Sequence, residues 1–353
     1  MIPPIPVVFE PIFKPRPWGG RELERLFGKK LPPGQPIGES WELADLPADV
    51  SVVRDGPLAG HALNQLLSMW GKDVSLCGHA LLGPARPSLL GRFPLLIKFL
   101  DARENLSVQV HPKPQDDDPA HWHAGVKDEA WYVVAAEPGS KVYIGLKPGV
   151  TPRDVAERAG TRGIVELLRE WPATPGQCFY LPSGTPHALG AGIVVAEVQT
   201  PFDVTYRLFD WDRVGLDGEP RELHIEQALA NIRYDTVTEH ILPTSRAGHG
   251  GLVRSPRFQI ERCEVPAGQP WTHGGPMRVL IVLSGSGIIV AGTPFLLTEP
   301  YERTFSPGDV ILVPASGCIQ VQPTAAADLL LVSVPPRDQH PQPPPARGHS
   351  AKD

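Results

Sequence analysis

The chain of 353 residues contains no long hydrophobic run, since no stretch approaches the roughly 18 consecutive apolar residues of a membrane-spanning helix. Its first residues also lack the basic stretch followed by an apolar stretch that is typical of a secretory signal. Neither sign of charge is in large excess, because the formal net charge is −6, which leaves no basic surface for nucleic acid or anionic lipid. We therefore expect a cytoplasmic protein that binds neither nucleic acid nor membrane.

Cysteine is scarce. The four residues, Cys77, Cys178, Cys263 and Cys318, lie far apart and form no Cys-x-x-Cys pair. This spacing does not suit a disulfide framework or a thiolate zinc site. We expect reduced cysteines that mostly fill buried space.

Proline and glycine are abundant, with 42 and 35 residues. They separate short apolar runs, a pattern typical of many short strands joined by turns. Helical periodicity is limited to residues 21–27, 61–70, 153–171 and 223–233. The sequence therefore predicts a mainly β protein with a few short helices. Residues 336–353 are rich in proline and polar residues, and we expect them to form a disordered tail.

An internal repeat suggests how the strands are organised. A glycine followed after five residues by a proline occurs at Gly176 and Pro182 and again at Gly308 and Pro314. Upstream of each copy lies an apparent hairpin, over residues 129–145 and 278–292. The two copies predict two similar jelly-roll β-barrels in tandem. We assign residues 1–240 to a first, catalytic barrel with helical additions and residues 241–335 to a second barrel.

The stretch LSVQVHP places polar side chains in an apolar segment. Strand geometry puts Ser107, Gln109 and His111 on one face and Val108 and Val110 on the other. A buried amide or imidazole without a partner costs roughly 1 to 3 kcal/mol. Either Gln109 and His111 bond each other and the backbone, or they bind a metal together with ligands from elsewhere in the chain.

The residues around this stretch resemble a known family. GQCFYLPSGTPH fits the second cupin motif, Gly-x5-Pro-x-Gly-x2-His, which ends at His187. LSVQVHP, the following KDEAWYVV and the PSGTPHA segment together resemble the type I mannose-6-phosphate isomerase family, a group of zinc-dependent cupins. WGG, GESWEL, FPLLIKFLDA and VAEVQTPFDVTYRLFDWDR extend the resemblance over roughly residues 10–230. The length resembles the shorter bacterial branch of that family.

The resemblance implies one zinc ion per chain. The implied ligands are Gln109, His111, Glu129 and His187. Two imidazoles, a carboxylate and an amide oxygen leave a coordination position open, as a catalytic zinc requires. His121 and His123 have the spacing of a competing site, but they follow DDDPA in an apparent loop, and we interpret them as solvated residues.

The second barrel departs from this pattern. Arg278 stands where Glu129 stands in the first copy, and Ile319 stands where His187 does. Neither side chain can replace a carboxylate or imidazole ligand. We expect the second barrel to be metal-free and structural.

The implied activity is the interconversion of mannose 6-phosphate and fructose 6-phosphate through an enediol. By the same resemblance, Glu197 is a base and Arg207 stabilises the enediolate or the phosphate, with Lys127 beside them. Ser107 and Lys98 complete the substrate-binding lining. An alternative for Glu197 and Arg207 is a buried ion pair, and Lys98 could be an ordinary strand lysine whose ammonium reaches solvent.

Other functions remain open. A zinc cupin with this sequence could bind a sugar or sugar phosphate without turnover, or it could isomerise a related sugar. An iron or manganese cupin oxygenase fits less well, because Gln109 replaces the usual histidine. The sequence indicates a small sugar phosphate as partner, but neither the exact sugar nor the oligomeric state.

Overall fold

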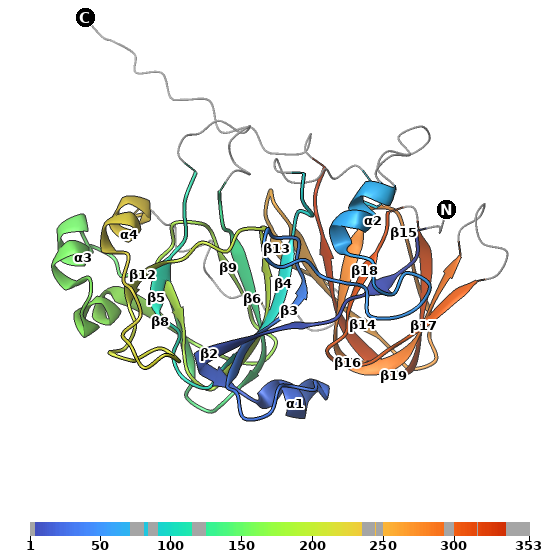
Figure 1. Cartoon of the computed structure of the whole chain (residues 1–353), viewed down its shortest axis with the longest axis horizontal. Helices are drawn as coiled ribbons and strands as arrows, with labels where there is room; N and C mark the ends of the chain where they lie inside the picture. The colour runs from blue at the N-terminus through green and yellow to red at the C-terminus, as the bar shows by residue number, and fades with distance from the viewer. Residues whose placement is uncertain are drawn as a thin grey trace, which may run out of the picture.

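The computed structural model describes residues 4–70, 81–83, 91–114, 125–234, 244, 250–292, 300–315 and 317–336. Cys77, His121, His123, the boundary at residues 240 and 241, and residues 337–353 of the expected tail lie outside this part of the chain. Strands dominate the described residues, so the prediction of a mainly β fold is confirmed (Figure 1).

The first half of the molecule contains two sheets. The six-stranded sheet has the order β2 (Ile12–Gly20), β3 (Ile37–Leu43), β4 (Leu96–Ala102), β11 (Ile193–Gln199), β6 (Glu129–Ala136) and β9 (Cys178–Leu181). The five-stranded sheet has the order β12 (Tyr206–Phe209), β5 (Val108–Val110), β10 (His187–Leu189), β7 (Lys141–Leu146) and β8 (Leu168–Pro172). Trp131 and Phe179 of the first sheet share an apolar cluster with Ile144 and Leu189 of the second, so the two sheets pack face to face.

The second half contains one eight-stranded sheet. Its order is β1 (Val7–Val8), β18 (Val310–Val313), β16 (Arg278–Gly292), β19 (Cys318–Ser333), β14 (Gln259–Val265) and β13 (Gly250–Arg254), with β15 (Trp271–Gly274) on β19 and β17 (Tyr301–Phe305) on β16. The pairing of β16 with β19 shifts register three times between Val282 and Gly287. Such irregularities bend a strand, so β16 and β19 curve around their own apolar cluster.

Two details of the expected barrels differ from the structure. Residues 278–292 form one long strand rather than a hairpin. The strands within residues 129–145 do not pair with each other, because β6 pairs with β9 and β11 while β7 pairs with β8 and β10. Among the described residues, hydrogen bonding closes neither half into a complete barrel, so the expectation of two closed barrels is not confirmed.

The helices are short, as predicted. They are α1 (Glu22–Phe27), α2 (Leu63–Trp70), α3 (Pro152–Arg158) and α4 (Ile225–Asn231). Gly28 ends α1 in the left-handed conformation, with φ of +62°. The helix expected up to Trp171 is only partly formed, since a 3-10 helix, η1 (Arg162–Leu167), leads directly into β8.

The glycine–proline repeat occupies equivalent places in the two halves. Glu129 on β6 pairs with Leu181, the residue before Pro182. Arg278 on β16 pairs with Val313, the residue before Pro314. The register therefore places Arg278 where Glu129 lies in the first half, as the internal repeat predicted.

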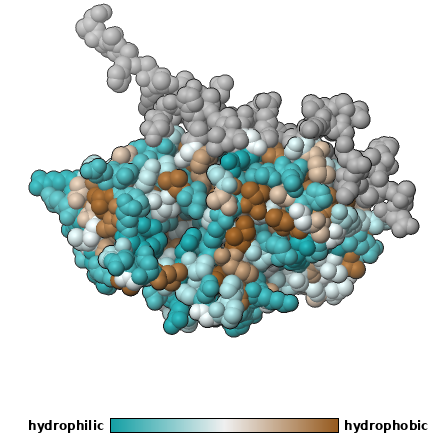
Figure 2. Space-filling model, viewed as in Figure 1, coloured by the Kyte–Doolittle hydropathy of each residue, from teal (hydrophilic) through white to brown (hydrophobic). Residues whose placement is uncertain are grey.

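The two halves share a core. The N-terminal strand β1 leaves the first half and pairs with β18, with Val7 opposite Leu312. One apolar cluster joins Leu66 of α2, Ile97 of β4 and Val279 of β16. Figure 2 shows a largely hydrophilic face with hydrophobic residues near its middle, where the halves meet. None of the helices in the described part of the chain has the length and apolar character of a membrane span.

Candidate active site

The five-stranded sheet aligns three predicted site residues. Gln109 on β5 lies opposite His187 of β10 on one side and opposite Arg207 of β12 on the other. Residues directly opposite each other in neighbouring strands point to the same face of a sheet. This register brings together side chains that are almost 100 residues apart in the chain.

The six-stranded sheet supplies the facing groups. Glu197 on β11 lies opposite Lys98 of β4 and Trp131 of β6. Glu129 is two residues before Trp131 and therefore shares its face. Lys127, two residues earlier still, has a buried side chain whose ammonium reaches Glu129. The predicted residues from both sheets thus point into the space between them.

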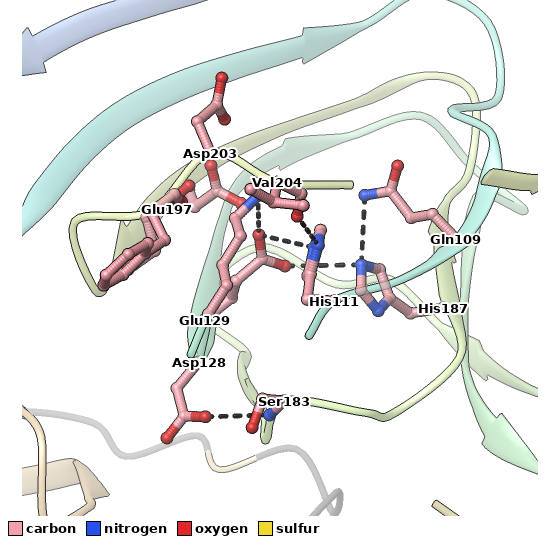
Figure 3. A network of polar contacts seen from close by, with 12 residues as sticks. Gln109, His111, Asp128, Glu129, Ser183, His187, Glu197, Asp203 and Val204 are labelled. Atoms are coloured by element: carbon pink, nitrogen blue, oxygen red, sulfur yellow. Dashed lines mark hydrogen bonds and ion pairs between the residues drawn. The ribbon is translucent and has the colours of Figure 1, made fainter. Parts of the chain in front are cut away.

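His111, Glu129 and His187 form a compact buried cluster (Figure 3). Their potential ligand atoms all lie within 4.8 Å of one another. His111 Nε2 is 3.1 Å from Glu129 Oε1, and His187 Nε2 is 3.5 Å from Glu129 Oε2. Three of the four predicted metal ligands are therefore close enough to share one ion.

The hydrogen bonds of the imidazoles test whether this cluster suits a metal. His111 Nδ1 donates to the carbonyl oxygen of Val204 at 2.9 Å, and His187 Nδ1 donates to that of Thr185 at 2.8 Å. Both Nε2 atoms therefore carry lone pairs that face the Glu129 carboxylate. Lone pairs and a carboxylate repel each other unless a cation lies between them.

Unsatisfied atoms support the same conclusion. His111 Nε2 and Glu129 Oε2 are buried without a hydrogen-bond partner, and Glu129 Oε1 has the ammonium of Lys127 beside it. Burial and, to a smaller extent, repulsion from His111 lower the pKa of His187 to about 3, so its imidazole is neutral at physiological pH. Neutral imidazoles and an ionised carboxylate are the forms that bind a metal ion. The residues present fit a divalent cation.

Gln109 lies beside the cluster with its amide nitrogen turned inward. Its Nε2 donates to His187 Nε2 at 3.2 Å, and its Oε1 accepts a hydrogen bond from Ser107 Oγ at 3.0 Å. The predicted ligand is thus adjacent to the cluster, but rotation of the amide is needed to present its oxygen. Ser107, predicted to bind substrate, controls the orientation of that amide.

Lys127 contacts the cluster directly. Its Nζ lies 2.8 Å from Glu129 Oε1, and both side chains are buried. Burial would raise the pKa of Glu129, but His111 and Lys127 hold it well below its ordinary value. Glu129 therefore remains ionised, and the ammonium of Lys127 is available at the edge of the cluster.

Glu197 pairs with Lys98 rather than with Arg207, so the alternative of a Glu197–Arg207 ion pair is wrong. Trp131 Nε1 donates to Glu197 Oε1 at 3.0 Å, and Lys98 Nζ is 3.5 Å from Glu197 Oε2. Burial, together with the nearby charge of Glu129, raises the pKa of Glu197 to about 7. This carboxyl group can both accept and release a proton near neutral pH.

Lys98 is buried among three carboxylates and does not reach solvent as an ordinary strand lysine would. Besides Glu197, it lies 3.2 Å from Asp203 Oδ1 and 3.6 Å from Glu39 Oε2. Burial would lower the pKa of Lys98, but the charges of Asp203, Glu197 and Glu39 raise it above its ordinary value.

Glu39 and Asp203 were not predicted as site residues, although both lie within the segments GESWEL and VAEVQTPFDVTYR that carry the family resemblance. Acidic residues inside those segments were the available signal.

Arg207 lines the cavity of the site. Its Nη1 donates to the carbonyl oxygen of Glu222 at 2.5 Å, while its Nε has no hydrogen-bond partner. A cavity of about 610 Å³ opens here, and Arg207, Arg16, Arg221, Ser107, Gln109, Lys127, Glu129, Glu197, Lys98 and Asp203 all line it. Arg16 and Arg221 are further cations that sequence reasoning missed. The cavity is thus bounded by Glu129 of the metal cluster, by Glu197 and by three guanidinium groups.

Known proteins share this sequence and fold. The profile of the phosphomannose isomerase type I catalytic domain matches residues 8–135. A probable mannose-6-phosphate isomerase of Bacillus subtilis is 34% identical over 309 residues, which cover 83% of this chain and 93% of that protein. The crystal structure of the mannose 6-phosphate isomerase from Bacillus subtilis has 27% identity and a TM-score of 0.76, covering 93% of this chain and 99% of that chain.

A more distant crystal structure, of a mannose 6-phosphate isomerase bound with zinc and yttrium, has the same fold. Its TM-score is 0.67 at 17% identity, with 93% of this chain and 99% of that chain covered. The relatives and the solved structures match this chain over most of its length. The chain belongs to the type I phosphomannose isomerase family.

Proposed function

We propose that this protein interconverts mannose 6-phosphate and fructose 6-phosphate. The observation that carries the proposal is that Glu129 of the metal-fitting cluster and the carboxyl group of Glu197, whose pKa is raised to about 7, line the same cavity. Aldose–ketose isomerisation needs both functions, because the vicinal oxygens must be polarised while a proton moves between C2 and C1. Membership of the family supports the choice of substrate.

The proposed metal is one zinc ion per chain. Its ligands are His111, Glu129 and His187, with Gln109 as a fourth after rotation of its amide. Nitrogen and oxygen donors of this kind suit zinc, and the zinc-bound isomerase of the same fold supports the choice. When bound, zinc supplies a Lewis acid that polarises sugar oxygens.

Glu197 is the proposed base. It removes the proton from C2 of the open-chain aldose, and the electron pair forms the enediolate. A proton moves from the C2 hydroxyl to O1, and Glu197 returns its proton to C1 as the C2 carbonyl of the ketose forms. Its pKa of about 7 suits this double role, since a base must be matched to the pH at which it works. Trp131, which donates to Glu197 Oε1, orients the carboxylate.

The cations of the cavity stabilise negative charge. Lys127 next to Glu129 is placed to donate to a sugar oxygen near the metal site, and Arg207 to stabilise the enediolate or bind the phosphate. Buried cations facing developing charge contribute strongly, because they need little reorganisation during the reaction. Ser107 and Lys98 act as the remaining polar lining for the substrate.

The test is turnover of mannose 6-phosphate, followed by coupled detection of fructose 6-phosphate, in wild type and in Glu197→Gln. The amide keeps the shape of the side chain but loses its basicity, so kcat should fall at least 100-fold while the metal is retained. Glu42→Gln is the matched control, because Glu42 is buried on β3 of the same sheet and pairs with Lys29. Its kcat should remain within about twofold of wild type.

Arg207→Ala separates the two roles of the guanidinium. If Arg207 binds the phosphate, KM should rise with little change in kcat; if it stabilises the enediolate, kcat should fall. A Glu197→Gln protein with turnover within a few-fold of wild type would show that the base is another group. A metal-loaded wild type without turnover would favour a sugar-phosphate-binding protein instead.

A further inference from the structure

Asp128 lies between two site residues but points away from the site. Lys127 and Glu129 project into the cavity, so strand alternation turns Asp128 to the opposite side. Figure 3 shows its carboxylate directed away from the histidine cluster, toward Ser183. Asp128 is itself buried, with an exposed fraction of 5%. A carboxylate in this position needs partners other than the metal site.

The partners of the carboxylate fix the approach to His187. The backbone nitrogen of Ser183 donates to Asp128 Oδ1 at 2.9 Å, and the hydroxyl of Tyr180 donates to Oδ2 at 2.8 Å. Tyr180 and Ser183 belong to β9 and to the turn that leads into His187. Asp128 therefore ties the strand of one metal ligand to the turn before another.

The backbone of Asp128 makes a second connection. Its nitrogen donates to Thr200 Oγ1 at 3.2 Å, and the nitrogen of Thr200 donates to the carbonyl oxygen of Asp128 at 3.1 Å. Thr200 lies between Glu197 and Asp203 in the chain. Three segments that carry site residues thus meet at Asp128.

The counter-charge of Asp128 comes from the other half of the molecule. Arg257, between β13 and β14, donates from Nε to Asp128 Oδ2 at 2.8 Å, and both side chains are buried. Ser255 holds Arg257 in a tight turn, because its Oγ accepts hydrogen bonds from the nitrogens of Arg257 and Phe258. A buried charge that loses its partner is strongly unfavourable.

We infer that Arg257 is a positioning residue, through which the C-terminal half holds the metal ligands and Lys127 in place by way of Asp128. Arg257 lies outside the lining of the cavity, and its contact with Asp128 connects it to the site. The inference rests on the proposed function for its kinetic readout, whereas its metal-affinity readout does not depend on which sugar is turned over.

A second ion pair between the two halves serves as the control for a general effect on how the halves pack against each other. Arg303 of β17 is buried and pairs with Asp55 of the N-terminal half. Asp55 neighbours no predicted ligand in the chain. Loss of the Arg303 pair should weaken the packing of the molecule without changing the metal site.

The experiment compares Arg257→Gln, Arg257→Lys, Asp128→Asn, the Asp128→Asn/Arg257→Gln double variant and Arg303→Gln as full-length zinc-loaded proteins. Zinc affinity is measured by competition with a chromophoric chelator. kcat and KM are measured with mannose 6-phosphate as substrate, and folding is followed by thermal unfolding. We expect Arg257→Gln to weaken zinc binding about 10-fold to 100-fold, as loss of groups that orient ligands does, and to lower kcat more than it raises KM.

Three comparisons make this result specific. Arg257→Lys should restore part of the zinc affinity, because it retains the charge. In the Asp128→Asn background, Arg257→Gln should have little further effect, since coupled residues are not additive. Arg303→Gln should lower Tm while zinc affinity stays within about twofold of wild type.

The inference is overturned if folded Arg257→Gln binds zinc as wild type does. It is also overturned if Arg303→Gln weakens zinc binding as much as Arg257→Gln does. Should Arg257→Gln fail to fold, Arg257→Lys and the double variant provide the same comparison. A wild type that binds zinc but does not turn over mannose 6-phosphate would refute the proposed reaction and leave the zinc-affinity comparison valid.

Discussion

Glu197 is the residue at which folding and proposed chemistry conflict most. Its carboxyl group is buried beside Trp131 and Lys98, and the charge of Glu129 lies nearby. Both burial and Glu129 disfavour its ionised form, which raises its pKa to about 7. A base poised at neutral pH is therefore obtained at some loss of stability, as is common in active sites.

The stability of the metal-free protein should reveal this conflict. The pKa of Glu197 is raised from 4.5 to about 7, so the folded state holds the proton more tightly than the unfolded state does. The contribution of Glu197 to the free energy of unfolding should therefore fall as pH rises through this window, by roughly 3 kcal/mol in all. Glu197→Gln lacks this titration, and Lys98 keeps Asp203 and Glu39 as partners.

Urea unfolding after removal of metal by a chelator checks this prediction. Glu197→Gln should gain stability relative to wild type between pH 4.5 and pH 8, with most of the gain present by about pH 7. A difference between the two proteins that does not change with pH, or that changes in the opposite direction, would contradict the assigned environment of Glu197.

At this scale the sequence predicted which residues meet but not how their atoms are oriented. Strand alternation placed Gln109 and His111 on one face, and the structure brings both to the cluster. The inward amide nitrogen of Gln109 depends on Ser107 and His187, through contacts that span up to 78 residues of chain. Asp203 and Glu39 were missed, because their shared partner, Lys98, is recognisable only after the strands pair.

At the scale of strands, the repeat explains why the second half differs from the first. β9 and β18 follow the same glycine–proline pattern and pair in the same register with β6 and β16. The ligand positions nevertheless hold different chemistry. Arg278 donates to Glu261 at 2.9 Å, and Ile319 is buried in an apolar cluster. A structural role for this half stays a prediction.

Ile319→Ala tests that prediction. Removal of a buried isoleucine side chain leaves a cavity, so the free energy of unfolding should fall by about 2 to 5 kcal/mol. Zinc content and kcat per folded molecule should match wild type, because Ile319 lies in the apolar cluster of the eight-stranded sheet. Denaturant unfolding, elemental analysis and the isomerase assay on one preparation measure all three. A folded variant that has lost its metal would refute the structural role.

The incorrect predictions of a hairpin and of a longer helix have a physical cause. The turn signal EPGS between β6 and β7 is the same whether two strands pair or cross between sheets, so the sequence could not exclude a hairpin. Residues 168–172 have an apolar period that also suits a helix, but pairing of β8 with β7, including Lys141 opposite Pro172, determines their structure. Tertiary pairing overrides local pattern in such short segments.

At the scale of the molecule, the two halves are less separate than the repeat implied. β1 pairs with β18, and one apolar cluster contains residues of both halves. Arg257 of the second half reaches Asp128 beside the metal cluster. Sequence patterning predicted two β units, but these contacts join residues more than 100 positions apart and depend on the folded arrangement. The assigned division at residues 240 and 241 stays a prediction.

The most direct test of the whole account is a cycle of metal removal and return on the wild-type protein. We expect about one zinc per chain, as a single catalytic site requires, and conversion of mannose 6-phosphate to fructose 6-phosphate. Activity should disappear when a chelator removes the zinc and return when zinc is restored. A folded wild type that keeps full activity without metal, or that holds zinc at this stoichiometry and converts no mannose 6-phosphate, would contradict the account.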